Sequence, residues 1–165
     1  MKKMLIVVYS CTNGNTLGIA ETLQEATGAE LVRLETEEPY VGSYEEIVEQ
    51  GRREVESRYM PPVKAVGVKV EAYDVVAIGT PTWWYSMAPA MRSFLEGRDF
   101  RGQTIVPFTT HAGWPGHAME DIKAACWGAY SECEMEVQFD EEGGSRMITG
   151  AQELKDWVAS VKKIL

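Results

Sequence analysis

Positive charge is missing from the early part of the chain, where no Lys or Arg occurs between Met4 and Glu30. A loop that binds a nucleoside triphosphate needs the pattern Gly-x-x-x-x-Gly-Lys-Ser/Thr, whose Lys reaches the phosphates. A dinucleotide-binding turn needs G-x-G-x-x-G, and only Gly14 and Gly18 could belong to one. Glu35 does lie about 20 residues further on, the usual distance of a ribose-binding acid. We nevertheless rank a dinucleotide site well below a site for a single phosphate.

Cysteine is scarce, and long apolar runs are missing. Cys11, Cys126 and Cys133 are odd in number and have no metal-binding or redox spacing, so we expect reduced thiols. No segment approaches the ~20 apolar residues of a membrane helix. The apolar run after Lys2 and Lys3 is shorter than the core of a signal peptide. These features predict a cytoplasmic protein that has no membrane partner.

The overall charge is acidic, because 25 Asp and Glu residues outnumber 16 Lys and Arg residues and give a net charge of -9. This balance argues against nucleic acid as a partner. It favours protein partners that carry basic patches. The chain has 165 residues, of which 45% are hydrophobic, and we expect residues 1–165 to form one domain with a sizeable core.

The opening segment has the organisation of a phosphate-binding unit. Residues 4–9 form a continuous apolar run, typical of a strand buried on both faces of a parallel sheet. A helix is predicted over residues 16–27 and ends at Gly28. A helix start leaves backbone N–H groups unpaired and carries the positive end of the helix dipole, so it attracts anions. The loop between strand and helix adds neutral donors from Ser10, Thr12, Asn13, Asn15 and Thr16. An ordinary polar turn is the alternative interpretation of this loop.

The remainder of the chain alternates between strand and helix patterns. Strands are predicted for residues 30–34, 75–78, 104–110 and 135–139, and helices for residues 44–55, 89–96, 118–126 and 150–161. Such alternation is typical of an α/β fold, a doubly wound parallel sheet with helices on both faces.

Four local patterns refine this prediction. Pro107 cannot donate a ladder hydrogen bond, so it should lie at a bulge or at a locally unpaired edge. Capping boxes are predicted at residues 43–46 and 149–152, just before two of the helices. The apolar residues of helix 44–55 are expected to face inward.

Three unusual loops follow predicted strands, at residues 10–16, 79–85 and 111–116. Ligands of doubly wound sheets bind beyond the carboxyl ends of the strands at a switch point in strand order, so the loops should meet at one crevice. The first loop suits a phosphate, and the aromatic residues of the second provide flat apolar surface. The third has glycines for close backbone approach. A phosphate and a flat ring together describe FMN, although plain core packing is the alternative explanation of the Trp residues.

The motifs of these loops resemble those of the flavodoxin family over nearly the whole chain. They read YSCTNGNT at residues 9–16, GTPTWW at 79–84, PAMRSFL at 89–95 and FTTHAG at 108–113. The resemblance implies a flavodoxin-like, five-stranded parallel sheet in the order 2-1-3-4-5 that is established for flavodoxin, with FMN at the switch point.

The resemblance also implies roles for individual residues. The family's phosphate loop usually reads Ser/Thr-x-Thr-Gly-x-Thr, which fits from Gly14 to Thr16. Before Gly14 the pattern departs: either one residue is inserted, or Cys11 and Asn13 replace hydroxyl residues. Residues 81–84 would line the ring, and residues 110–113 would reach its pyrimidine side through backbone N–H groups. The predicted FMN-binding set is Ser10, Cys11 (mainly through its backbone), Thr12, Asn13, Gly14, Asn15, Thr16, Thr80, Pro81, Thr82, Trp83, Trp84, Tyr85, Thr110, His111, Ala112, Gly113 and Trp114.

The expected function is that of a low-potential electron carrier between redox proteins. Acidic charge and a crevice without Lys should disfavour extra negative charge on reduced FMN, which lowers its potential. The alternative is an FMN-dependent oxidoreductase that passes hydride from NAD(P)H to a quinone or a similar acceptor. In that alternative, His111 or Tyr85 could donate a proton. A binding module that has kept the fold and lost its redox activity is a third possibility.

Overall fold

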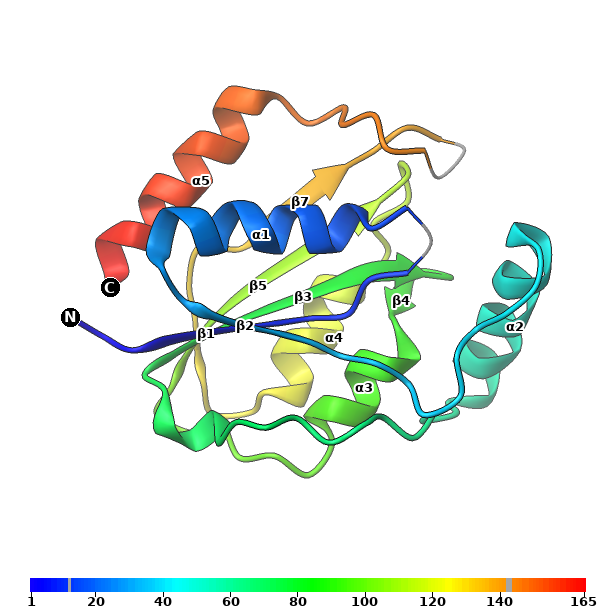
Figure 1. The fold of residues 1–165 in the computed structure, drawn as a ribbon, viewed down its shortest axis with the longest axis horizontal. Helices are drawn as coiled ribbons and strands as arrows, with labels where there is room; N and C mark the ends of the chain where they lie inside the picture. Colours follow the sequence, from blue (N-terminus) through cyan, green and yellow to red (C-terminus); the bar gives the residue numbers. More distant parts are fainter. Residues whose placement is uncertain (12, 142–143) are drawn as a thin grey trace.

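The computed structural model describes residues 1–11, 13–141 and 144–165 and contains a twisted parallel sheet (Figure 1). β1 (Met4–Val8) lies inside the sheet and all its residues are buried, as its apolar run predicts. It pairs in parallel with β2 (Glu30–Arg33) on one side and with β3 (Val75–Trp83) on the other. β5 (Thr104–His111) pairs in parallel with the far side of β3.

The fifth position of the sheet is divided between two short strands. β6 (Tyr130–Ser131) pairs with the start of β5, and β7 (Met135–Gln138) pairs with its end. Pro107 lies opposite the interruption, because the register leaves residues 106 and 107 paired only with β3. The predicted strand order and the predicted unpaired edge at Pro107 are therefore confirmed.

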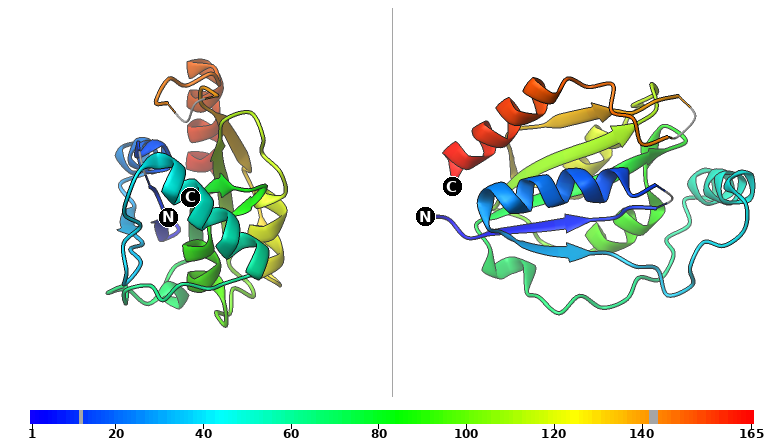
Figure 2. Two further views of the ribbon diagram at one scale, coloured as in Figure 1. Left: turned by 90° about the vertical axis from the view of Figure 1, so that its right-hand side faces the viewer. Right: turned by 45° about the horizontal axis from the view of Figure 1, so that its top comes forward.

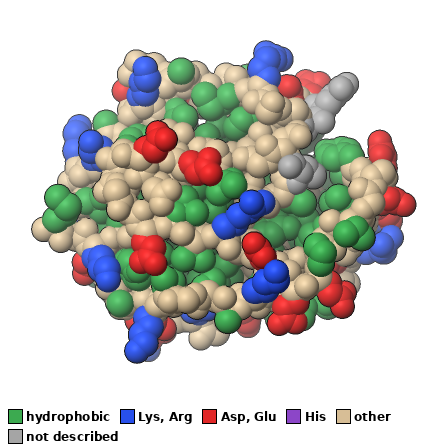
Figure 3. All heavy atoms as spheres, in the orientation of Figure 1, with side chains coloured by type: hydrophobic (Ala, Val, Ile, Leu, Met, Phe, Trp, Pro, Cys, Tyr) green, Lys and Arg blue, Asp and Glu red, His purple; other side chains and the backbone are tan. Residues whose placement is uncertain are grey.

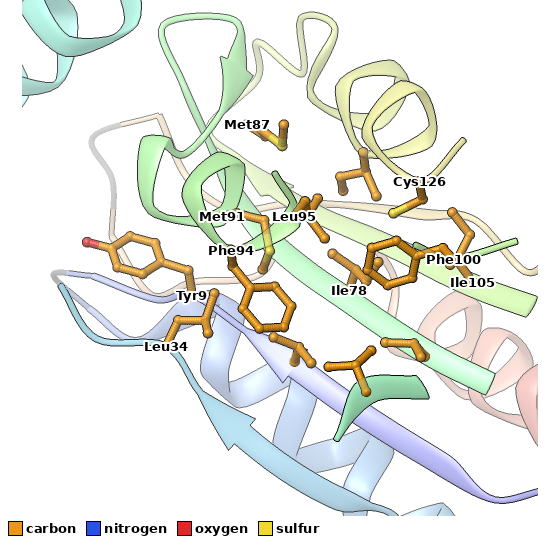
Figure 4. Close-up of a cluster of buried hydrophobic side chains, with 14 of the residues drawn as sticks. Tyr9, Leu34, Ile78, Met87, Met91, Phe94, Leu95, Phe100, Ile105 and Cys126 are labelled. Carbon is orange, nitrogen blue, oxygen red and sulfur yellow. The ribbon is translucent and has the colours of Figure 1, made fainter. Parts of the chain in front are cut away.

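Helices cover both faces of the sheet, as predicted (Figures 1 and 2). α1 (Asn15–Thr27) and α5 (Ala151–Ile164) pack on one face with one cluster of buried residues. α3 (Pro89–Leu95), α4 (Ala118–Ala125) and a short 3-10 turn, η1 (Val70–Ala72), pack on the other. Figure 4 shows this second cluster. Within the described part of the chain, no helix has the length and apolar character needed to span a membrane.

α2 (Tyr44–Ser57) lies apart from these two layers, beyond the carboxyl ends of the strands (Figures 1 and 2). Its predicted capping box is present: the Ser43 hydroxyl accepts from the backbone N–H of Glu46, whose carboxylate accepts from the N–H of Ser43. Of the residues predicted to face inward, Tyr44, Ile47, Val48 and Gly51 line a crevice at the strand ends and do not pack on the sheet. Only Gly51 and Glu54 of this helix are buried, and Tyr44 is half exposed.

Two further details differ from the sequence-based expectation. β4 (Ser86–Met87) adds a small antiparallel hairpin to the end of β3. The capping box predicted at residues 149–152 does not form, because Gly150 is the N-cap of α5 and offers no side chain. The Thr149 hydroxyl instead accepts a hydrogen bond from the backbone N–H of Gln138 at 2.8 Å.

Candidate functional site

A crevice of about 270 Å³ lies at the carboxyl ends of the central strands. The three predicted loops contribute to it, as does α2, which forms a further wall. Its lining consists of Cys11, Asn15, Thr16, Tyr44, Ile47, Val48, Gly51, Pro81, Thr82, Trp83, Trp84, Thr110, His111, Ala112 and Phe139. Among these described residues there is no Lys, Arg, Asp or Glu, so the lining has no permanent charge. It is polar at one end and aromatic at the other.

The polar end of the crevice is the amino terminus of α1. Gly14 is the N-cap residue and has a φ of 72°, a left-handed conformation that suits glycine. The Ser10 hydroxyl accepts a hydrogen bond from the Leu17 N–H at 3.2 Å, which fixes the loop to the first turn of the helix. The side chain of Asn15 donates to the carbonyl of Gly144 at 2.9 Å. Backbone and side-chain dipoles thus provide the polarity of this end.

A buried hydrogen bond connects the first and third loops. The hydroxyls of Thr16 and Thr110 are 2.7 Å apart, and the two residues are only 2% and 5% exposed. Thr16 lies in the first turn of α1, while Thr110 lies near the end of β5. The bond therefore holds the helix terminus against the neighbouring strand end.

Trp83 forms the inner part of the aromatic end. Its ring packs edge-on against Tyr9 at a centroid distance of 5.9 Å and against Tyr40 at 5.1 Å. The Tyr40 hydroxyl donates to the Glu54 carboxylate at 2.8 Å. Burial raises the pKa of both tyrosines, and burial also raises the pKa of Glu54, which the Tyr40 hydrogen bond partly offsets. The tyrosines are therefore neutral supports for the Trp83 ring.

Trp84 and Tyr85 form the exposed turn between β3 and β4. Both have positive φ values, 48° and 65°, which non-glycine residues rarely adopt and which cost about 1–3 kcal/mol each. The Trp84 indole N–H donates to the Val48 carbonyl of α2 at 2.9 Å. The Tyr85 carbonyl accepts from the His117 N–H at 2.7 Å, and Gly116 packs tightly against the Tyr85 backbone. The strained turn is thus held from two sides.

The third loop places an imidazole at the crevice. His111 Nδ1 accepts a hydrogen bond from the Gly113 N–H at 3.0 Å, so in this arrangement the ring proton is on Nε2. Burial lowers the pKa of His111, and Glu136 partly offsets this effect. The neutral ring with a proton on Nε2 is therefore the favoured form near neutral pH.

The structure brings together most of the residues predicted from the sequence, but not all. Ten of them line the crevice: Cys11, Asn15, Thr16, Pro81, Thr82, Trp83, Trp84, Thr110, His111 and Ala112. Of the other described members, six are not part of its lining: Ser10, Asn13, Gly14, Tyr85, Gly113 and Trp114. Thr80 is not part of the lining either: it is fully buried, and its hydroxyl accepts from the Ala88 N–H. Thr12 lies outside the described residues.

Sequence reasoning missed five lining residues, and four of them come from one face of α2: Tyr44, Ile47, Val48 and Gly51. Their helical spacing was visible in the sequence, but an amphipathic pattern does not say which surface a helix packs on. The fifth is Phe139, which follows the edge strand β7. Within residues 1–11, 13–141 and 144–165, no group of three or more His, Cys, Asp or Glu side chains could hold a metal ion.

Comparison with known proteins gives a consistent result for fold and family. A family model described as flavodoxin matches residues 3–161. A candidate flavoprotein from Bacteroides eggerthii is 25% identical, with a TM-score of 0.75, and the alignment covers 96% of this chain and 97% of that protein. A search of curated proteins finds no match.

Two solved structures of similar fold contain FMN. The flavoprotein from Lactobacillus acidophilus in complex with FMN is 20% identical, with a TM-score of 0.71, and the alignment covers 82% of this chain and 93% of that one. The flavodoxin from Fusobacterium nucleatum bound to FMN is 15% identical, with a TM-score of 0.59 and coverage of 100% and 99%. At these identities the likeness concerns the fold.

Proposed function

Because the chain belongs to the flavodoxin family, we propose that it is an electron carrier that binds FMN in the crevice and serves partner redox proteins. The observation that carries the proposal is the lining of the crevice. A polar helix terminus at one end and an aromatic wall at the other meet in one cavity that has no permanent charge among its described lining residues.

The chemistry of these residues fits the two ends of FMN. The α1 terminus, with Gly14, Asn15 and Thr16, would hold the phosphate through backbone and side-chain donors. Trp83 and Trp84 would provide apolar surface for the flat ring, to which aromatic residues bind without needing charge. The cavity therefore matches a ligand that is anionic at one end and planar at the other.

Bound FMN supplies the electron chemistry, and the protein contributes binding and the electrostatic surroundings. In this chain the surroundings combine a net charge of -9 with a described crevice lining that has no Lys or Arg. Such surroundings oppose the addition of negative charge near the ring. We therefore expect a low reduction potential, which suits a carrier that delivers electrons to other proteins.

The neutral lining also favours a carrier over a nicotinamide-dependent enzyme. A bound NAD(P)H brings additional phosphates, and Lys or Arg side chains are the usual partners for phosphate in protein sites. None is present among the described lining residues. Protein partners with basic patches would instead be attracted by the acidic surface. Acidic and basic side chains are interspersed on the face seen in Figure 3.

A second candidate, an FMN-dependent NAD(P)H oxidoreductase that reduces quinones or similar acceptors, is favoured by one observation. His111 lines the crevice, and its ring proton is on Nε2 because Nδ1 accepts from the Gly113 N–H. A neutral imidazole with its N–H on Nε2 could donate a hydrogen bond to an acceptor and stabilise negative charge that develops there. The two candidates predict different responses to NAD(P)H.

The first experiment is a titration of the flavin-free protein with FMN, followed by anaerobic addition of NADPH and then NADH. We expect saturable FMN binding, slow or absent reduction by either nucleotide, and reduction by a protein electron donor. If a nucleotide rapidly reduces the bound FMN and a quinone reoxidises it, the proposed function is that of the oxidoreductase and not of the carrier. Absence of FMN binding would reject both.

A pair of tryptophan variants tests the predicted position of the ring. Trp83→Leu should weaken FMN binding by about tenfold, because one edge-on or stacked aromatic contact contributes about 0.5–1.5 kcal/mol beyond its buried area. Trp127→Leu is the matched control, since Trp127 is 75% exposed and is absent from the crevice lining. Equal affinity in the two variants would argue against Trp83 as a ring contact.

A further inference from the structure

α2 is attached to the rest of the protein through few groups, although it forms a wall of the crevice. Of its 14 residues only Gly51 and Glu54 are buried. Its outer face is charged and includes Arg52, which forms ion pairs with Glu49 and Glu56. Charged side chains of both signs are visible at the right edge of Figure 3, where α2 lies. The position of this wall therefore depends on a small number of contacts at its inner face.

One of these contacts is the hydrogen bond from the Trp84 indole N–H to the Val48 carbonyl at 2.9 Å. Val48 lies within α2, where its carbonyl is also the regular acceptor for the N–H four residues further on. The indole thus adds a bond from outside the helix. Val48 and Trp84 both belong to the crevice lining, so the bond joins the wall formed by α2 to the wall formed by the turn after β3.

The donor is held on a rigid support. Trp84 and Tyr85 adopt left-handed backbone conformations, and such strain persists only where surrounding structure enforces it. Two contacts of this kind come from the segment before α4: the Tyr85 carbonyl accepts from the His117 N–H, and a Cβ at Gly116 would lie 2.3 Å from that carbonyl oxygen. The hairpin is therefore anchored to the segment before α4, and the Trp84 indole projects from this anchored hairpin to bond α2.

We propose that Trp84 is a positioning residue that holds α2 against the crevice and so fixes the wall formed by Tyr44, Ile47, Val48 and Gly51. Without its N–H, α2 separates from the crevice more often, and the ligand enters and leaves more rapidly. Gly51 defines how closely the wall approaches, because a Cβ there would lie 3.1 Å from the Trp83 ring. The proposal rests on the proposed function only for the identity of the ligand, FMN.

The test uses Trp84→Phe, which keeps an aromatic ring and removes the donor, in the chain of 165 residues without added flavin. Hydrogen–deuterium exchange should accelerate about three- to tenfold in residues 44–57, the range expected for the loss of one hydrogen bond. Exchange in α1 and α5 should remain unchanged. Trp127→Phe is the matched control, because Trp127 is 75% exposed, and it should leave α2 unchanged.

NMR of the indole N–H groups provides a direct second measurement. The Trp84 signal, assigned from its loss in Trp84→Phe, should exchange more slowly with solvent than the signals of Trp114 and Trp127, although all three side chains are exposed. Exchange as fast as that of Trp127 would overturn the proposal. Unchanged deuterium exchange of residues 44–57 in Trp84→Phe would also overturn it.

Binding kinetics separate positioning from simple contact. If Trp84 only touches FMN, Trp84→Phe should increase the dissociation rate and leave the association rate unchanged, a result that would overturn the proposal. If it positions α2, both rates should rise together and the dissociation constant should change less than either. The exchange and NMR measurements need no flavin, so a wild-type protein that fails to bind FMN would reject the proposed function without deciding the role of Trp84.

Discussion

Replacement of Thr16 by Val should lower the free energy of unfolding of the flavin-free protein by about 1–3 kcal/mol, although the two side chains have nearly the same shape. The cause is the partner hydroxyl of Thr110, which is 5% exposed and bonds to Thr16 at 2.7 Å. A buried hydroxyl that loses its partner bears a desolvation cost of about 1–3 kcal/mol. For a chain of this size, each kcal/mol lowers the melting temperature by about 2–4 °C.

The double variant Thr16→Val/Thr110→Val makes the reasoning testable. Removal of both hydroxyls leaves no orphaned group, so the double variant should be more stable than the sum of the two single changes predicts. Urea denaturation of the wild type and the three variants measures the coupling, which we expect to be about 1–2 kcal/mol. Strictly additive losses would refute the idea that the bond between the two hydroxyls joins the α1 terminus to β5.

Three further predictions concern other groups around the crevice. Gly116→Ala should lower the unfolding free energy by at least about 2 kcal/mol, measured by urea denaturation, because the new Cβ meets the Tyr85 backbone rather than a movable side chain. Glu54→Gln should stabilise the protein near neutral pH and have no such effect below about pH 4, as a pH series of the same assay would show. The raised pKa of Glu54 means that its contribution to stability is present at low pH and is lost as pH rises through the folded-state pKa. In an NMR titration, the pKa of His111 should lie below its ordinary value of 6.5. Because the neutral ring is favoured in the folded protein, the wild type should lose stability as pH falls from 6.5 through the lower folded-state pKa. His111→Gln should remove this pH dependence.

Each of these predictions has a clear contrary result. Wild-type stability in Gly116→Ala would mean that the loop moves freely away from Tyr85. A pH profile of Glu54→Gln parallel to that of the wild type would mean that the carboxyl is not desolvated. A titration midpoint of His111 at or above 6.5 would mean that its attraction to Glu136 outweighs its burial.

Much of the fold could be predicted because strand and helix patterns are local and strong. The apolar run of β1 and the strand–loop–helix alternation predict a doubly wound sheet, and the missing N–H of Pro107 predicts the unpaired edge opposite the break between β6 and β7. The convergence of three loops followed from the direction of parallel strands. Contact of the individual loop residues with FMN stays a prediction.

The parts that could not be predicted depend on contacts between distant segments. The hairpin turn at Trp84 and Tyr85 has none of the Asn-Gly or Gly residues that favour such turns, and its backbone is held by the segment around Gly116. The Thr149 hydroxyl does not cap α5, because it accepts a hydrogen bond from the backbone N–H of Gln138, a residue of another segment. The position of α2 over the crevice and not on the sheet could not be predicted either, because the spacing of its apolar residues fits both surfaces and only tertiary contacts decide between them.

The divided fifth strand also bears on whether another chain could pair with the edge of the sheet. An exposed, continuous strand edge is a template onto which another chain can add. Here β6 has two residues and β7 has four, and the end of β7 is covered because the Ile148 N–H donates to the Gln138 carbonyl. At the opposite edge β2 is only four residues long and has a charged residue at each end. A sheet whose central strands are mostly apolar thus offers neighbouring molecules little edge on which to pair.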